Sequence, residues 1–364
     1  MNPLFESLGM RLPLIQAPMA GSQGSALALA VCGAGGLGSL PAATLSLEAL
    51  ADELRRLRDG VAGLGAGGSP APYNVNFFCH QPPGHDAARE QAWLAAMAPL
   101  YAEAQVQAPS LPLAAGRTPF TAEAAALLAQ FRPPVVSFHF GLPEPRLLET
   151  VRAWGAKVLS SATTVAEARW LERQGVDAII AQGLEAGGHR GHFLSEDLSE
   201  QSGTFALLPQ VVRAVRVPVI AAGGLADATG VAAARSLGAA GVQVGTAYLL
   251  CPEASTTPLH RAALQSEAAG HTALSNVFTG RPARGIVNRA MRVLGRDGDP
   301  LNPSAPAFPL ATSAIAPLRA AAEARGSSDF SPLWAGQAAR LCQPMSAAAL
   351  TQALAAGWCL ESGA

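Results

Sequence analysis

Short apolar segments recur along the chain, and each ends in small or polar residues that lead into a stretch of helical character. Eight of these segments predict β-strands, at 14–17, 36–40, 74–78, 135–140, 157–161, 178–182, 217–222 and 242–245. Their apolar runs are continuous rather than alternating, as expected for parallel strands with both faces buried. Helices are predicted between them, most clearly at 46–58 (with Ser46 as N-cap), 86–104, 164–174, 205–215 and 226–237.

The alternation of strands and helices favours an α/β fold. Eight repeats within about 250 residues match a (β/α)8 TIM barrel, and an open, doubly wound sheet is the alternative. Residues 33–38 (Gly-Ala-Gly-Gly-Leu-Gly) resemble the glycine fingerprint of dinucleotide-binding folds, but they precede a predicted strand instead of following one. The pattern therefore favours the barrel.

The rest of the chain has a different character. Helices are predicted at 259–269, 311–325 and 345–356, with a proline-rich segment at 297–309. We expect residues 1–250 to form the barrel and residues 251–364 to form a smaller, mainly helical lobe that caps one mouth of it. The helix at 345–356 is a candidate to return to the barrel.

Composition narrows the class of protein. The 364 residues are 49% hydrophobic and 14% charged, which suffices for a full core and is too apolar for a disordered chain. The formal net charge of -1 leaves no basic surface for nucleic acid. Lys157 is the only lysine, so no lysine cluster is available as a Schiff base or phosphate clamp.

The uncharged stretch 12–47 is long enough to raise the question of a membrane helix. Three prolines and six glycines interrupt it, and Glu6 precedes it without a basic segment, so we expect neither a membrane span nor a signal peptide. The five cysteines are widely spaced and form no CxxC pair, which is typical of free cytoplasmic thiols. We therefore expect a cytoplasmic monomer or homodimer without membrane or nucleic-acid partners.

Glycines follow the seventh and eighth predicted strands, in the tetrapeptides Ala221, Ala222, Gly223, Gly224 and Gln243, Val244, Gly245, Thr246. Barrel enzymes often bind a phosphate at these two strand ends. Glycine lets phosphate oxygens approach backbone N–H groups, and Thr246 adds a hydroxyl donor. A nucleotide, a sugar phosphate or a flavin would suit such a site, and tight turns without a ligand are the alternative.

The sixth predicted strand runs into Gln182 and then into the tripeptide Gly187, Gly188, His189. Glycines next to a histidine expose its ring, and histidine is well suited to proton transfer near neutral pH. We expect His189 to be a catalytic acid or base, and Gln182 to bond the edge of a bound heterocycle. A solvated loop histidine is the alternative.

Other polar residues on predicted strands are weaker candidates. His139 either faces the site or packs in the core. We expect Asn74 and Asn76 to point to opposite sides of the third strand, satisfied by a ligand, a neighbouring strand or water. His192 follows His189 without a third ligand or an HExxH pattern, so we expect no metal site.

Six of these segments together resemble the nitronate monooxygenases, also called 2-nitropropane dioxygenases. In chain order they are QAPMAG at 16–21, YNVNF at 73–77, VSFHFG at 136–141, QGLEAGGH at 182–189, AAGG at 221–224 and QVGT at 243–246. The match continues more weakly into PAFP at 306–309 and WAGQ at 334–337. Each segment alone is weakly specific, whereas their ordered combination is specific for the superfamily.

The resemblance implies an FMN-dependent barrel with a substrate-capping lobe. His189 would be the catalytic base, and Ser137 and His139 would lie on the substrate side. FMN would contact Ala17, Pro18, Met19, Asn76, Gln182, Gly187, Gly188, Gly223, Gly224, Gln243, Val244, Gly245 and Thr246.

The resemblance also implies a reaction. Family members oxidise alkyl nitronates, such as propionate 3-nitronate, with O2 to a carbonyl compound and nitrite or nitrate, through a flavin semiquinone and without a nicotinamide. The partners would be a small-molecule nitronate and O2, and the role would be detoxification of nitro compounds. His189 would remove the α-proton of a neutral nitroalkane, and a protonated His189 would hold the oxygens of a nitronate.

One departure and two rival functions accompany this resemblance. Some family members present tyrosine and lysine side chains from the lobe to the substrate, whereas 297–309 contains neither. An FMN-dependent NAD(P)H reductase, of the enoyl-acyl-carrier-protein or quinone reductase type, would share the barrel and the Gly-Gly-His tripeptide. A non-catalytic flavin-binding protein would keep the phosphate glycines without needing His189. The SFHFG wording and the long C-terminal extension favour the monooxygenase.

Overall fold

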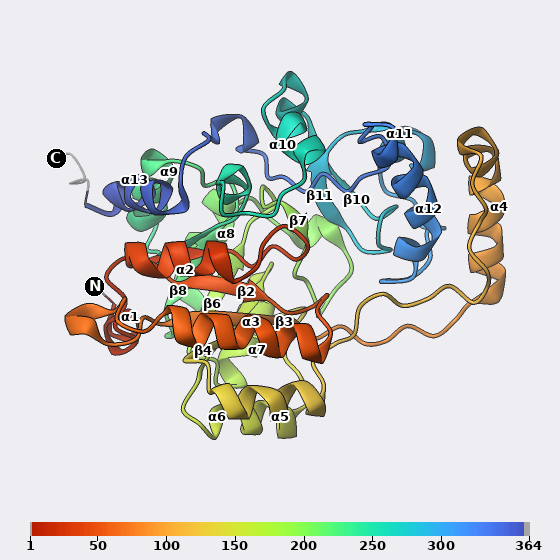
Figure 1. Ribbon diagram of the computed structural model, residues 1–364. Helices are drawn as coiled ribbons and strands as arrows, with labels where there is room; N and C mark the ends of the chain where they lie inside the picture. Colours follow the sequence, from red (N-terminus) through yellow and green to blue (C-terminus); the bar gives the residue numbers. More distant parts are fainter. Residues whose placement is uncertain (1, 360–364) are drawn as a thin grey trace.

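Eight parallel strands form the centre of the molecule (Figure 1), which the computed structural model describes over residues 2–359. They are β1 (Leu14–Gln16), β2 (Gly38–Pro41), β3 (Tyr73–Phe78), β4 (Val135–His139), β5 (Lys157–Ala162), β6 (Ala178–Gln182), β8 (Val219–Ala222) and β9 (Gly241–Val244). Their hydrogen-bonded order is β1-β9-β8-β6-β5-β4-β3-β2. The two edges meet where the N–H of Gln16 donates to the carbonyl of Leu37, directly before β2, at 3.0 Å. The eight predicted strands and the predicted barrel are therefore confirmed.

Helices pack around the outside of this barrel. α3 begins as predicted, because the Ser46 hydroxyl accepts the N–H of Ala49 at 3.2 Å. The pattern does not predict α2, whose small and apolar residues form no polar face. The helices are α2 (Ser25–Ala34), α3 (Leu47–Gly60), α5 (Ala122–Phe131), α6 (Pro145–Arg152), α7 (Val165–Arg173), α8 (Thr204–Ala214) and α9 (Ala228–Ser236).

The amino end of the barrel is filled by apolar side chains. α1 (Pro3–Ser7) contributes Phe5, which is 1% exposed and packs in one cluster with Met10, Ile15 and Val135. The carboxyl end is therefore the end left for a functional site, as in other barrels of this type.

The C-terminal part contains a small sheet in addition to helices. Its strands β10 (Thr272–Ser275) and β11 (Ala283–Ile286) are antiparallel, and β11 also pairs with β7 (Gly188–His189). The lobe is thus less purely helical than expected, and it is joined to the segment that carries His189. Its helices are α10 (Pro258–Leu264), α11 (Arg289–Leu294) and α12 (Ala311–Ala324).

Packing crosses the predicted boundary at residue 250 in both directions. α4 (Ala87–Ala104) lies away from the barrel against α12 (Figure 1), where the hydroxyl of Tyr101 donates to the carbonyl of Ala314 at 2.6 Å. Trp93 and Met97 of α4 belong to the core of the lobe. Conversely, α13 (Ala347–Cys359) packs against α2 and α9, as its predicted return to the barrel requires. The division at residue 250 itself stays a prediction.

Within residues 2–359, none of the helices combines the length and apolar character needed to cross a membrane.

Gly38 sets the distance between β2 and α2. A Cβ on this residue would lie 2.1 Å from the carbonyl oxygen of Ala28, and this backbone atom moves only if the helix moves. Gly38→Ala should therefore lower the free energy of unfolding by about 1–3 kcal/mol or more, measured by denaturant unfolding.

Gly33→Ala is the matched control, because Gly33 lies on α2, the helix that Gly38 contacts, and has space beside it. Its Cβ would lie 3.9 Å from Leu64 Cδ1, an ordinary contact. This substitution should be neutral or should raise the free energy of unfolding by up to about 1 kcal/mol. Equal destabilisation by the two substitutions would contradict the packing argument.

Candidate active site

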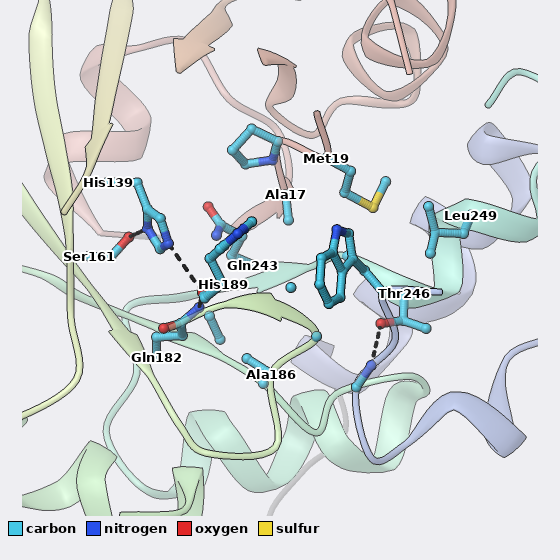
Figure 2. A pocket seen from close by; sticks show the side chains of 18 of the residues that line it. Ala17, Met19, His139, Ser161, Gln182, Ala186, His189, Gln243, Thr246 and Leu249 are labelled. Atoms are coloured by element: carbon cyan, nitrogen blue, oxygen red, sulfur yellow. Dashed lines mark hydrogen bonds between the residues drawn. The ribbon is translucent and has the colours of Figure 1, made fainter. Parts of the chain in front are cut away.

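A large cavity opens at the carboxyl ends of the barrel strands (Figure 2). It contains about 1330 Å³ of empty space, which includes the open solvent at its mouth. Every predicted site residue except Val244 lines it. The side chain of Val244 packs in the barrel core, and its carbonyl accepts the N–H of Ala17 at 2.8 Å. The candidate residues, which are spread along the sequence, therefore gather around one cavity.

Two buried glutamines hold the loop that follows β1. Gln16 Nε2 donates to Gln23 Oε1 at 2.6 Å, and the same oxygen accepts the N–H of Met19 at 3.1 Å. Gln16 Oε1 accepts the N–H of Ser39 at 3.0 Å, which ties the loop to β2. Residues 17–19 are thereby fixed as one wall of the cavity.

Asn74 and Asn76 both face Ser137. The Nδ2 atom of each donates to Ser137 Oγ at 2.9 Å, and Asn74 Nδ2 also donates to Ser39 Oγ at 3.0 Å. The expectation that the two asparagines point to opposite sides is wrong, because residues i and i+2 of a strand share a face. Neighbouring strands satisfy their amide nitrogens, while Asn76 and Ser137 still border the cavity.

His139 faces the site and fixes its neighbour. Its Nδ1 lies 2.8 Å from Ser161 Oγ, and its Nε2 lies 3.2 Å from the carbonyl oxygen of His189 (Figure 2). A carbonyl only accepts, so Nε2 carries the proton and Nδ1 accepts from the serine. Burial lowers the pKa of His139 to about 3, which keeps the ring in this neutral form at neutral pH. His139 is thus a positioning residue for the His189 backbone.

Gln182 braces the same segment from β6. Its Nε2 donates to the carbonyl of His189 at 2.9 Å, and its Oε1 accepts the N–H of Gly191 at 2.8 Å. The amide oxygen is therefore committed to the backbone, and one Nε2 proton is left for a ligand.

Arg190 is completely buried beneath this segment. Its guanidinium donates to the carbonyls of Gln182 and Gly183, at 2.8 and 2.7 Å, and to Gln201 Oε1 at 2.8 Å. Burial lowers the pKa of Arg190 to about 9, so the side chain remains a cation at neutral pH. Arg190 therefore sets the path of the chain that leads to His189.

Thr279 of the lobe orients the His189 ring. His189 Nε2 lies 2.9 Å from Thr279 Oγ1, and this hydroxyl donates to the carbonyl of Arg281 at 3.3 Å. Nε2 therefore carries the proton, and Nδ1 is the basic nitrogen, without a bond from any residue in 2–359. Burial holds the pKa of His189 well below 6.5, and the charge of Arg117 lowers it further. The ring is thus neutral and able to take up a proton.

Four aromatic rings lie around the half-buried His189. Ring centroids lie 5.3 Å away for Phe308, 5.5 Å for Trp334, 6.1 Å for Phe140 and 6.2 Å for Phe78. These apolar surroundings disfavour the charged form of the ring, which agrees with its lowered pKa.

The predicted phosphate end contains glycines that no larger residue can replace. Gly223 and Gly224 have φ angles of 107° and 72°, and a Cβ on Gly187 would lie 2.6 Å from the nitrogen of Gly336. The N–H of Gly336 donates to Thr246 Oγ1 at 3.0 Å (Figure 2). The Thr246 hydroxyl proton is therefore left to donate to an anionic oxygen.

Several cavity residues lie outside the predicted set. Trp334 and Gly336 belong to the WAGQ segment, which carries a weak signal in the sequence. No sequence signal indicates Arg117, because only the path of the chain after α4 brings this residue to the cavity. The lobe and the segment after it also contribute His260, Ala338 and Cys342. Within the described residues, no three His, Cys, Asp or Glu side chains come together as metal ligands.

Comparison with known structures agrees with this architecture. Nitroalkane oxidase from Streptomyces ansochromogenes superposes with a TM-score of 0.86 at 36% identity, over 98% of both chains. FabK from Thermotoga maritima superposes with a TM-score of 0.72 at 24% identity, over 98% of this chain and 96% of that one. The second likeness shows a shared fold alone.

Comparison of sequences identifies the family of the chain. A family model described as nitronate monooxygenase matches residues 2–357. A nitronate monooxygenase from Paraburkholderia phytofirmans is 42% identical over 353 residues, which are 96% of this chain and 93% of that protein. One from Pseudomonas aeruginosa is 42% identical over 352 residues, or 95% and 96% of the two chains. With the family model spanning the barrel, the cavity and the lobe alike, the chain belongs to the nitronate monooxygenase family and is an oxidoreductase.

Proposed function

We propose that this protein oxidises alkyl nitronates of the propionate 3-nitronate type, with FMN as cofactor and O2 as oxidant, to a carbonyl compound and nitrite or nitrate. The observation that carries the proposal is the half-buried, neutral His189, which lines the cavity and whose Nδ1 has no hydrogen-bond partner among the described residues. Membership of the family supports the same activity.

The cavity offers groups that suit FMN. Gly224 and Gly245 expose backbone, and the Thr246 hydroxyl proton is available to a phosphate oxygen. Gln243 Oε1 is buried without a hydrogen-bond partner, as expected of an amide that serves a ligand, and Gln182 retains one amide proton. When bound, FMN supplies the electron acceptor between the nitronate and O2.

The remaining contacts with FMN are assigned by their place on the same cavity wall. The loop after β1 would lie against the ring, and the other backbone contacts would come from the ends of β3, β6, β8 and β9. These residues are Ala17, Pro18, Met19, Asn76, Gly187, Gly188 and Gly223, and Val244 would contribute only as the backbone neighbour of Gly245, because its side chain packs in the core.

His189 would act through Nδ1. For a neutral nitroalkane, Nδ1 takes the α-proton while Thr279 holds the opposite edge of the ring. His139 and Gln182 hold the His189 carbonyl, so the base is fixed at both its backbone and its ring. The lowered pKa favours this role over a protonated ring that holds nitro oxygens. Ser137 and His139 border the space left for the substrate.

Anaerobic mixing tests the proposal. Purified full-length protein should carry FMN, and propionate 3-nitronate should bleach its visible absorbance while NADH and NADPH leave it unchanged. Rapid bleaching by NAD(P)H alone would favour the reductase alternative. Bound flavin that responds to none of the three would favour a flavin-binding protein, and absence of FMN from the purified protein would contradict the cofactor assignment.

His189→Asn should separate proton removal from oxidation. Turnover of a neutral nitroalkane should fall by about 10²–10⁴-fold, because the α-proton then has no base. Turnover of the corresponding preformed nitronate should fall far less. Steady-state oxygen consumption measures both rates, and His271→Asn, on an exposed residue of the lobe, is the matched control. Equal losses with the two substrates would argue against the base role.

The pH profile gives a second test of His189. Because its pKa lies well below 6.5, the base form persists as the pH falls through 6.5. The acid limb of kcat/KM for a neutral nitroalkane should therefore lie below pH 6.5. Arg117→Met removes one of the charges that depress this pKa and should move the limb to higher pH. A limb at or above 6.5 in the unsubstituted protein would contradict the proposed environment.

A further inference from the structure

Arg117 is the only arginine or lysine that borders the cavity within residues 2–359. It lies on the segment between α4 and α5, which rejoins the barrel where the N–H of Phe120 donates to the carbonyl of Phe78 at 2.8 Å. Its guanidinium carbon lies 5.6 Å from the centre of the Phe308 ring, and Nη1 donates to Thr312 Oγ1 at 3.3 Å. The lobe thus holds this cation against the cavity.

No acidic side chain balances the charge of Arg117. Among the described residues, no carboxylate forms an ion pair with it, and the charge that acts on it is the like charge of Arg319. Arg319 itself pairs with Glu323 at 2.7 Å. A half-buried cation without a counter-ion is costly, and an anionic ligand would remove that cost.

The cofactor phosphate is an unsuitable partner for this cation. In the strand order, β3 is separated from β8 by three strands on one side, β4, β5 and β6, and by three on the other, β2, β1 and β9. The segment that carries Arg117 is anchored at β3, whereas the phosphate glycines follow β8 and β9. Arg117 therefore enters from the opposite side of the barrel mouth, next to the rings around His189.

The distance to His189 suits a short substrate chain. Both residues lie against the Phe308 ring, whose centre is 5.6 Å from the guanidinium carbon and 5.3 Å from the His189 ring centre, so these groups are at most about 11 Å apart. Three bonds separate the nitro nitrogen of propionate 3-nitronate from its carboxyl carbon and span about 3.8 Å when extended. A charge-assisted hydrogen bond of about 2.8 Å from Arg117 to the carboxylate fits within this distance and leaves the reacting end of the substrate beside the His189 ring.

We infer that Arg117 determines substrate specificity by binding a carboxylate at the far end of the substrate, so that the enzyme prefers nitronates with a second anionic group. The inference rests on the proposed function and adds the residue that selects among its substrates. A guanidinium matches a carboxylate with two parallel hydrogen bonds, which lysine does not reproduce. The lobe segment 297–309 offers no lysine or tyrosine for this purpose, so the cation comes from the barrel side.

Two substrates of equal chain length isolate this interaction. Kinetics of the FMN-loaded, full-length protein are measured with propionate 3-nitronate and with propyl 1-nitronate, which lacks the carboxylate. Arg117→Met should lower kcat/KM for propionate 3-nitronate by about 10- to 100-fold, mainly through KM, and should change the value for propyl 1-nitronate less than about threefold. Arg117→Lys should give an intermediate loss, and it also serves if the methionine variant does not fold.

Arg319→Met is the matched control. It removes the same charge from a neighbouring arginine that does not border the cavity. The ratio of the two kcat/KM values should stay as in the unsubstituted protein. If Arg117 only packs the lobe against the barrel, Arg117→Met lowers both values by the same factor, and this result would overturn the inference.

Binding supplies a readout that does not depend on oxidation. Calorimetry should show tighter binding of 3-nitropropionate than of 1-nitropropane, and Arg117→Met should abolish the difference. If neither nitronate is oxidised but this preference is present and is lost in the variant, the proposed function fails and the role of Arg117 stands. If both nitronates are oxidised and no preference depends on Arg117, the proposed function stands and the role of Arg117 fails.

Discussion

The site depends on the buried guanidinium of Arg190 and on its hydrogen bonds to two backbone carbonyl groups. Parallel strands end with carbonyls that point out of the barrel, and a chain leaving β6 has to find donors for them. Arg190 donates to the carbonyls of Gln182 and Gly183, and it does so without a direct carboxylate partner among the described residues. The tight path from Gln182 to His189 follows from these bonds. His139, Gln182 and Thr279 then act on a segment whose course is already set.

Positive charge around the cavity and neutral histidines inside it form one electrostatic arrangement. Burial and the charge of nearby arginines lower the pKa values of His139 and His189, so these rings remain uncharged. The same arginines create a positive potential over the cavity, which suits an anionic substrate and an anionic cofactor phosphate. Burial, helped by these cations, keeps the His189 ring unprotonated, and the same cations would favour an anionic ligand in the cavity. Placing acids nearby would weaken both effects.

The barrel and most of its site could be predicted from sequence because their signals are local. Each strand is a short apolar run, and the strand ends carry the glycines, Gln182 and His189 within the same few residues. The position of α4 and the strand pairing of β7 with β11 depend on contacts between residues far apart in the chain, so no periodicity indicates them. Arg117 was missed for the same reason. Asn74 and Asn76 share one face of β3 instead of opposite faces, as the two-residue period of a strand requires.

The excursion of α4 makes barrel and lobe mutually dependent. The chain leaves the barrel after β3, contributes Trp93, Met97 and Tyr101 to the core of the lobe, and returns before β4. The last helix travels the other way and covers α2 and α9. Cutting the chain at residue 250 would therefore expose apolar surface on both fragments instead of releasing two finished modules. Each part contributes a helix to the other, so a lobe transferred to another barrel would need α4 and the loops on either side of it.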